Sequence, residues 1–435
     1  MKQYLFCFLL LTVTVMGACK KDDDNNNGNN TPPTNYRPII MVHGFLASGD
    51  TYAGQAMRLS SNGYEQNKIY VFDWNSLNQG GNPGALLDQL IDSVLAASGA
   101  SQVDLVGHSA GSGLGFTYIS DSTQATKVAH YIHLAGNPQP SVPVYGGDTV
   151  KVLNIWSAAD SVVAGGTIPG ATNITLQGAD HYQVATSEQT FTELFKFCNA
   201  GKAPQTVTIT PQTPIQIGGK CVTLGENAPM VGATVRIYAV DNATGFRTGT
   251  LPEATLTVDS KGKWGPVNVS ANLTYEFEVV SADTADRVVH YYREGFKRSN
   301  YLVYLRTLPP AGSLAGLLLN SLPSNDNQTV LGFFASSQAV ITGRDNFSVN
   351  NTNLAISPFA DASKTAIAYF LYDDGDNASG LNAVGLFGQF PFLNGVDMFF
   401  ATSPPQTISL QFNGRTLNVP NLKSATDGVI VAVFD

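Results

Sequence analysis

The stretch VDLVGHSAGSG, residues 103–113, sets a serine between two glycines directly after a short apolar run. This spacing is typical of a strand that turns so sharply into a helix that only glycine fits beside the turn. Ser109 would then stand at the tip of the turn with its hydroxyl exposed. A loose loop of small residues is the alternative. The flanking sequence favours the sharp turn, because GFTYIS, residues 115–120, can continue as a helix.

Short apolar runs alternate with helical patterns between residues 37 and 201. The runs, which predict parallel strands buried on both faces, lie at 38–42, 69–73, 103–106, 130–135, 150–156 and 173–176. The segments 84–98 and 189–198 carry apolar residues at helical spacing. This alternation predicts an α/β domain, a mostly parallel sheet with flanking helices, whose connections leave no room for a large inserted lid.

The texture changes after residue 202, where Pro- and Thr-rich segments alternate apolar and polar residues with period two. We expect a β-sandwich or barrel-like region at 202–307. A second β-rich region at 308–435 can pack against the first, with one helix at 313–322. The chain of 435 residues is long enough for two or three such domains.

Composition excludes several function classes. The net charge of −9 and the lack of Lys/Arg clusters make nucleic acid an unexpected partner. The sequence carries no phosphate-binding loop, no paired CxxC and no HExxH, so that no cofactor and no metal are expected.

A nucleophilic serine needs a neighbouring base, and six histidines are available. His108 is too close to Ser109 in the chain to bend back to it, and His130 and His133 lie on a predicted strand. His181 follows the last predicted strand of the α/β domain, where the chain order Ser, Asp, His puts the base. A surface histidine is the alternative.

The base needs a carboxylate to orient it, and the transition state needs N–H donors for its oxyanion. Asp160 follows the strand predicted at 150–156 and is the expected acid, although such an aspartate can also be a simple turn residue. The backbone N–H of Ala110, which opens a helix, and that of Phe45, after the first strand, are the expected oxyanion donors.

The stretches PIIMVHGFLASG, VDLVGHSAGSG, WSAADSVV and GADHYQV together resemble the α/β-hydrolase esterases and lipases, particularly small bacterial lipases without a lid. The resemblance covers residues 37–201 and implies the α/β-hydrolase fold, a triad of Ser109, Asp160 and His181, and an oxyanion hole of Phe45 and Ala110. More weakly, the whole layout resembles two-domain archaeal-type lipases with a C-terminal β-domain that binds lipid.

The N-terminus reads as a targeting segment. Lys2 precedes an apolar run at 4–16, and small residues stand before Cys19, as in bacterial lipoproteins whose cysteine is acylated. A plain secretory signal is the alternative. We expect a signal peptide at 1–18 and a polar tether at 19–36, and KKDDD, residues 20–24, resembles a surface-export signal of Bacteroidetes-type lipoproteins. These features predict a surface-exposed outer-membrane lipoprotein, attached to the membrane through its lipid.

Two further features stay open. Cys198 and Cys221 can form a disulfide outside the cytoplasm or remain two buried thiols. The turn YDDGDNASG, residues 372–380, is oxygen-rich but lacks the twelve-residue calcium-loop spacing, which favours a solvated acidic turn over a metal site.

The expected function is a lipid-anchored serine carboxylesterase or lipase that acts on esters with an apolar acyl group. Apolar neighbours of the motifs, which suggest that acyl group, are Phe45, Leu46, Ile132, Trp156, Val162 and Val163. Amides, thioesters and polysaccharide O-acyl esters would suit the same triad. A rival places the function in the β-rich half as a glycan-binding adhesin, with HYYREGF, residues 290–296, as its aromatic cluster or as sandwich core.

Overall fold

The structure is a computed structural model that describes residues 36–435 apart from 148, 284–285, 308–313, 386, 388–389 and 391. The signal peptide, the lipidated Cys19 and nearly all of the tether predicted from the sequence lie outside the described residues. Residues 35–435 form one compact unit. No helix in the described part of the chain is long and apolar enough to cross a bilayer.

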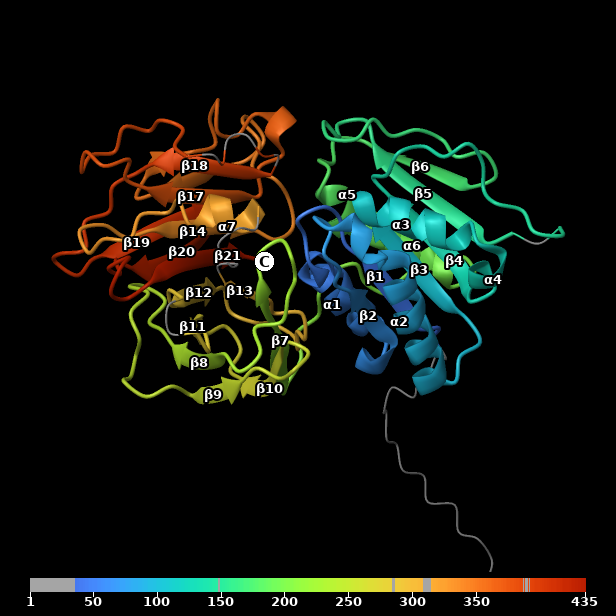
Figure 1. Cartoon of the computed structure of the whole chain (residues 1–435), viewed down its shortest axis with the longest axis horizontal. Helices are drawn as coiled ribbons and strands as arrows, with labels where there is room; N and C mark the ends of the chain where they lie inside the picture. Colours follow the sequence, from blue (N-terminus) through green and yellow to red (C-terminus); the bar gives the residue numbers. More distant parts are fainter. Residues whose placement is uncertain are drawn as a thin grey trace, which may run out of the picture. The chain divides into compact units, whose positions relative to one another are not determined.

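A six-stranded parallel sheet forms the first half of this unit, in the order β2-β1-β3-β4-β5-β6 (Figure 1). Its strands are β1 (Ile39–Val42), β2 (Ile69–Phe72), β3 (Val103–His108), β4 (Val128–Leu134), β5 (Lys151–Ser157) and β6 (Thr172–Leu176). Each contains most of a run predicted from the sequence, which confirms the predicted parallel sheet.

Helices cover both faces of this sheet. Its α-helices are α1 (Ala53–Ser61), α2 (Pro83–Ser98), α3 (Ala110–Ile119), α4 (Ser122–Ala125), α5 (Gln183–Thr186) and α6 (Glu188–Cys198). Successive residues of β1 alternate between the two cores: Ile39 and Met41 pack with α1 and α6, whereas Ile40 and Val42 pack with α2 and α3. This two-sided burial explains the continuous apolar runs of the sequence.

The rest of the chain is mostly β-structure. The strands are β7 (Ile215–Thr223), β8 (Thr234–Ala239), β9 (Ala254–Thr257), β10 (Lys263–Val269), β11 (Tyr275–Val280), β12 (Val289–Arg293), β13 (Leu305–Thr307), β14 (Leu331–Ala335), β15 (Phe347–Val349), β16 (Thr352–Asn353), β17 (Ala368–Tyr372), β18 (Leu393–Asp397), β19 (Thr407–Phe412), β20 (Arg415–Pro420) and β21 (Val429–Phe434). The helix expected near residue 313 is the short α7 (Leu314–Leu319).

One eight-stranded sheet uses strands from both sides of residue 308, in the order β18-β17-β14-β21-β12-β11-β8-β9. Its centre is the parallel pairing of β12 with β21, in which Val289 lies opposite Val429. The two C-terminal regions therefore share a sheet. The smaller sheets are β10-β7-β13 and β16-β15-β19-β20.

The aromatic residues of β12 settle one alternative. Tyr291 and Tyr292 are 4% and 1% exposed, and Phe296 is 5% exposed. They belong to the interior, so that HYYREGF does not present the exposed aromatic cluster that a glycan-binding face would need.

Candidate active site

The strand-to-helix turn at Ser109 is as sharp as its sequence predicts. Ser109 lies between the end of β3 and the start of α3 with φ 54° and ψ −122°. A Cβ on Gly107 would lie 2.4 Å from the Gly111 carbonyl oxygen, and a Cβ on Gly111 would lie 2.4 Å from the His43 carbonyl oxygen. Both positions accept only glycine, because the turn presses its backbone against neighbouring chain.

His181 and Asp160 meet at the same end of the sheet. His181 Nδ1 lies 2.7 Å from Asp160 Oδ2, and their side chains are only 2% and 1% exposed. The other carboxylate oxygen accepts the N–H groups of Val162 and Val163 at 2.8 and 3.1 Å. Burial raises the pKa of Asp160, but the hydrogen bonds and the His181 ring outweigh it, so that the pKa lies below its ordinary value.

Asp160 is therefore a carboxylate at neutral pH, and the proton of a neutral His181 ring belongs on Nδ1. His181 Nε2 is buried and has no hydrogen-bond partner within the described residues. Ser109 and His181 line the same cavity, although no hydrogen bond joins the serine hydroxyl to this Nε2 in the described part of the chain. This ring nitrogen therefore has no competing hydrogen-bond partner among the described residues, as a general base requires.

Two rings hold His181 in place. His108 Nε2 donates to the His181 carbonyl oxygen at 2.9 Å, and the two ring centroids are 4.8 Å apart. Burial, helped by the nearby His181, lowers the pKa of His108 to about 3, so that His108 stays neutral. The second ring is that of Phe392, from the C-terminal region, which stacks on the His181 ring with the two centroids 5.9 Å apart. No pattern in the sequence links this phenylalanine to the site.

The loop after β1 approaches the serine from the other side. A Cβ on Gly44 would lie 3.0 Å from Ser109 Cβ, and Phe45 lines the cavity with 37% of its surface exposed. Among the described residues, neither the Phe45 N–H nor the Ala110 N–H donates to another group. The two N–H groups expected to bind an oxyanion therefore belong to residues next to Gly44 and Ser109 and have no other acceptor among the described residues.

This loop is braced by a residue from the β-rich region. Asn227 Nδ2 donates to the carbonyl oxygens of Ala47 and Trp74 at 2.9 and 3.0 Å, and its Oδ1 accepts the Ser48 hydroxyl. Asn227 is 8% exposed and has φ 59°, a left-handed conformation that asparagine tolerates. The sequence shows it only as part of a turn, Asn-Ala-Pro, so that its role in bracing the loop was missed.

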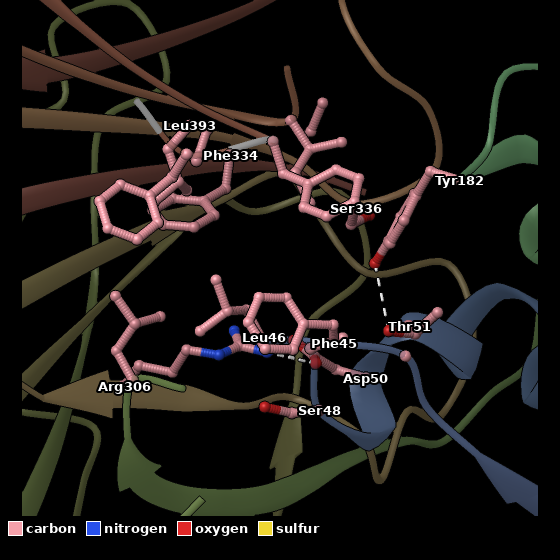
Figure 2. A pocket seen from close by; sticks show the side chains of 18 of the residues that line it. Phe45, Leu46, Ser48, Asp50, Thr51, Tyr182, Arg306, Phe334, Ser336 and Leu393 are labelled. Carbon is pink, nitrogen blue, oxygen red and sulfur yellow. Dashed lines mark hydrogen bonds and ion pairs between the residues drawn. The ribbon is translucent and has the colours of Figure 1, made fainter. Parts of the chain in front are cut away.

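A largely apolar cavity opens at Ser109 and encloses about 1220 Å³ of space, its mouth included. Figure 2 shows Phe45 and Leu46 on one side and Phe334 and Leu393 on the other. Its polar lining includes the Asp50–Arg306 ion pair and a hydrogen bond between Tyr182 and Thr51 at 3.3 Å. Further apolar lining comes from Leu318, Leu319, Phe370, Phe387, Phe390 and Phe392.

The apolar lining expected from sequence neighbours is only partly correct. Phe45 and Leu46 line the cavity, but Ile132, Trp156, Val162 and Val163 are not among the described residues that do so. Ile132 faces the core under the sheet instead, where it is fully buried. Adjacency in sequence to a catalytic motif does not place a strand residue in the cavity, because alternate residues point to opposite faces.

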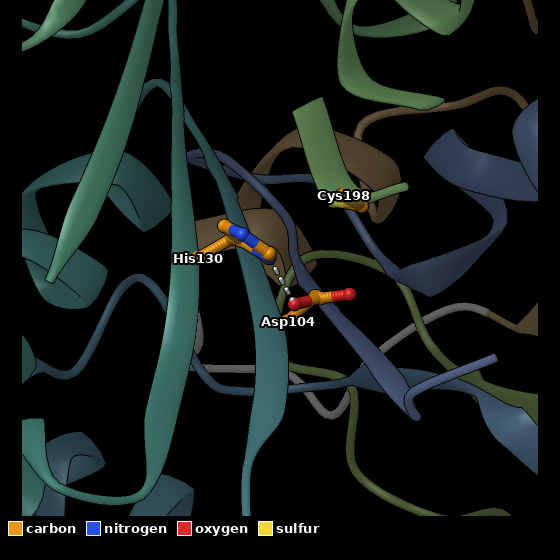
Figure 3. A group of neighbouring side chains, drawn as sticks. All are labelled: Asp104, His130 and Cys198. Atoms are coloured by element: carbon orange, nitrogen blue, oxygen red, sulfur yellow. Dashed lines mark hydrogen bonds and ion pairs between the residues drawn. The ribbon is translucent and has the colours of Figure 1, made fainter. Parts of the chain in front are cut away.

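A second group of chemically active side chains lies where helix α6 meets the sheet: Asp104 on β3, His130 on β4 and Cys198 at the end of α6 (Figure 3). His130 Nδ1 lies 2.8 Å from Asp104 Oδ1, and Arg37 Nη1 lies 3.1 Å from the same oxygen. The arginine already neutralises the carboxylate, which disfavours a bound metal ion. Cys198 and Cys221 are both free and buried, so that the disulfide alternative is wrong.

The first half of the chain has the α/β-hydrolase fold. Residues 37–181 match the family model of the alpha/beta hydrolase fold, and residues 213–310 match that of the lipase C-terminal domain. A further family model, described as a C-terminal domain, matches residues 334–435. These matches confirm the resemblance to lipases and esterases that the sequence motifs predicted.

Known lipases are the relatives of the first half. A triacylglycerol lipase of Pseudarthrobacter phenanthrenivorans is 29% identical over 238 residues, which cover 51% of this chain and 72% of that lipase. One of Burkholderia plantarii is 29% identical over 238 residues, covering 51% of this chain and 64%, just under two thirds, of that lipase. The crystal structure of Aspergillus fumigatus lipase B is similar over 40% of this chain and 54% of that chain, with 15% identity and a TM-score of 0.32.

Proposed function

We propose that this protein hydrolyses carboxylic esters with an apolar acyl group through an acyl-serine intermediate on Ser109. The observation that carries the proposal is the His181 Nδ1 to Asp160 Oδ2 hydrogen bond of 2.7 Å, which leaves His181 Nε2 free beside the cavity that Ser109 lines. The lipase relatives support the ester substrate.

The proposed mechanism follows from the protonation states. His181 Nε2 accepts the Ser109 proton as the hydroxyl oxygen attacks the ester carbonyl, and the Asp160 carboxylate stabilises the imidazolium that forms. The Phe45 and Ala110 N–H groups stabilise the oxyanion. His181 then gives the proton to the leaving alcohol, and a water molecule activated by the same ring releases the acid.

The substrate class rests on the cavity. Its walls are mostly aromatic and aliphatic side chains, many of them from the C-terminal region, so that an acyl chain entering it leaves water. Each buried methylene stabilises the bound chain by about 0.8 kcal/mol at most. The cavity favours a long apolar acyl chain over the short acyl groups of polysaccharides, and the lipase relatives favour an ester over an amide or a thioester.

A series of p-nitrophenyl esters of increasing acyl length tests this function. We expect kcat/KM to rise with chain length for the wild type and kcat to fall about 10⁶-fold in Ser109→Ala and about 10⁴-fold in Asp160→Asn. Ser120→Ala, an exposed serine at the end of α3, is the matched control and should keep full activity. Equal turnover by wild type and Ser109→Ala would contradict the proposal.

We further propose that the protein is a bacterial lipoprotein, held at the outer membrane by acylated Cys19 and exposed at the cell surface. The apolar run at 4–16, the small residues before Cys19 and the charged segment 20–24 support this. Replacing Cys19 by serine should move the protein from the membrane fraction to the soluble fraction of cells, and an unchanged distribution would refute the anchor.

A further inference from the structure

The C-terminal ends of two neighbouring strands bring acidic residues together. β17 and β18 pair in parallel with Tyr372 opposite Asp397. Asp373 and Asp374 follow β17 directly, so that they lie beside Asp397 although the chain separates them. One carboxylate oxygen from each of Asp373, Asp374 and Asp397 lies within 4.8 Å of the others. Oxygen atoms that share one calcium ion, each at about 2.4 Å from it, can be no further apart than about this distance.

Only part of this cluster is solvated. Residues 374–380 of the turn are exposed, as expected for a solvated acidic turn, but the carboxylates of Asp373 and Asp397 are buried. Asp374 is exposed, but Asp373 is 4% exposed and Asp397 is 1% exposed. Asp373 Oδ1 is buried and has no hydrogen-bond partner within the described residues. A buried carboxylate oxygen without a partner is unfavourable unless a cation or donor satisfies it.

No basic side chain among the described residues neutralises these carboxylates. In the described part of the chain, Asp373, Asp374 and Asp397 form no ion pair with Lys, Arg or His. Their partners are backbone N–H groups: Asp397 accepts from Asp374 and Gly380 at 3.2 and 2.7 Å, and Asp373 Oδ2 accepts from Gly375 at 3.1 Å.

A second acidic cluster differs from this one in having an arginine partner. Glu276, Glu278 and His290 also gather within 4.8 Å, but Arg247 forms ion pairs with both glutamates. The chain itself therefore supplies the cation in that cluster, as Arg37 does beside Asp104. At Asp373, Asp374 and Asp397 the described chain supplies none.

We propose that Asp373, Asp374 and Asp397 bind a calcium ion. All three donors are hard oxygen atoms without a nitrogen or sulfur ligand, which suits calcium and disfavours zinc. A third carboxylate from a neighbouring strand takes the place of the regular spacing of a single calcium loop. The ion would tie β18, at the edge of the eight-stranded sheet, to β17.

Binding is tested on the whole protein after removal of divalent ions with EDTA. Calcium chloride should raise Tm saturably, because an ion that binds only the folded state stabilises it. Magnesium at the same concentration should do much less. Terbium should bind in place of calcium and emit when Tyr372, next to Asp373, is excited, and added calcium should quench that emission. If calcium changes neither Tm nor terbium emission in the wild type, the proposal is wrong.

Variants separate a metal site from a merely structural cluster. Asp373→Asn and Asp397→Asn should lose the calcium-dependent rise in Tm, and Asp373→Asn without calcium should melt no lower than the wild type, because repulsion is relieved. Glu278→Gln, in the arginine-paired cluster, is the matched control and should keep the full calcium response. If Asp397→Asn does not fold, Asp374→Asn, whose side chain is exposed, replaces it. A calcium response in these variants equal to that of the wild type would overturn the assignment.

Discussion

The His108 ring ties the backbone of the proposed base to the turn that carries the proposed nucleophile. Its Nε2 proton reaches the His181 carbonyl oxygen, and its surroundings are so apolar that its pKa falls to about 3. His133, also buried, has its pKa lowered to about 4 by burial. Burial disfavours the charged form of both rings, because a buried imidazolium loses its hydration, so that protonation of either ring destabilises the fold.

These two histidines predict acid sensitivity. The unfolded chain binds a proton on each near pH 6.5, whereas the folded chain resists until about pH 3 to 4, so that stability present above pH 6.5 is lost as the pH falls through that window. Each ring contributes a slope of up to about 1.4 kcal/mol per pH unit. The free energy of unfolding, measured with urea at several pH values from 7 to 5, should therefore change less with pH in His108→Gln than in the wild type. An identical slope would mean that His108 is not buried and neutral.

At the scale of elements, the loop between β1 and α1 is held from both directions. Within the first domain, Gly49 N–H donates to Asp73 Oδ1 at 2.7 Å. From the β-rich region, Lys220 and Tyr304 bind Asp73 Oδ2 at 2.5 and 2.6 Å, and Asn227 binds the loop itself. A loop that carries an oxyanion donor must not drift, since misplacement by about 1 Å is costly in rate.

Asn227→Asp tests this bracing. The substitution keeps the shape and the tolerance of a left-handed backbone, but a carboxylate cannot donate to the Ala47 and Trp74 carbonyl oxygens. We expect kcat to fall about 10- to 100-fold with KM little changed, because the loop loses position while the acyl cavity stays. Asn272→Asp, at another left-handed turn position, φ 63°, is the control and should retain activity. Unchanged kcat in Asn227→Asp would show that the loop keeps its position without the hydrogen bonds of Asn227.

The sequence predicted the elements of the first domain well because its signals are local. The runs for β1 and β2 and the apolar stripe of α2 are set by residues a few positions apart. The same holds for Ser109 and its glycines. Asn227 and Ser48, by contrast, are 179 residues apart, and no local pattern marks their contact. Phe392 and Asp397 were missed for the same reason, because contacts between segments far apart in the chain bring them to their sites.

One hydrophobic cluster of the molecule spans the boundary at residue 202. Val222, Leu302 and Tyr304 pack in the same cluster as Ile39 and Phe191, on the face of the parallel sheet that α1 and α6 cover. Arg306, from β13, forms its ion pair with Asp50 inside the cavity. The β-rich region therefore completes the core of the first domain as well as the wall of the cavity.

A chain shortened to end near Lys202 should consequently not fold into an active α/β hydrolase. It would expose the face that Val222, Leu302 and Tyr304 cover and leave Asp50 and Asp73 without their basic partners, Arg306 and Lys220. Buried charges that lose a partner are strongly destabilising. We expect the shortened chain to be insoluble or to lack a cooperative thermal transition, whereas residues 35–435 should unfold in one transition by calorimetry. A soluble, cooperatively folding shortened chain with the ester chain-length profile of the whole protein would mean that the first domain needs neither the shared core nor the cavity wall.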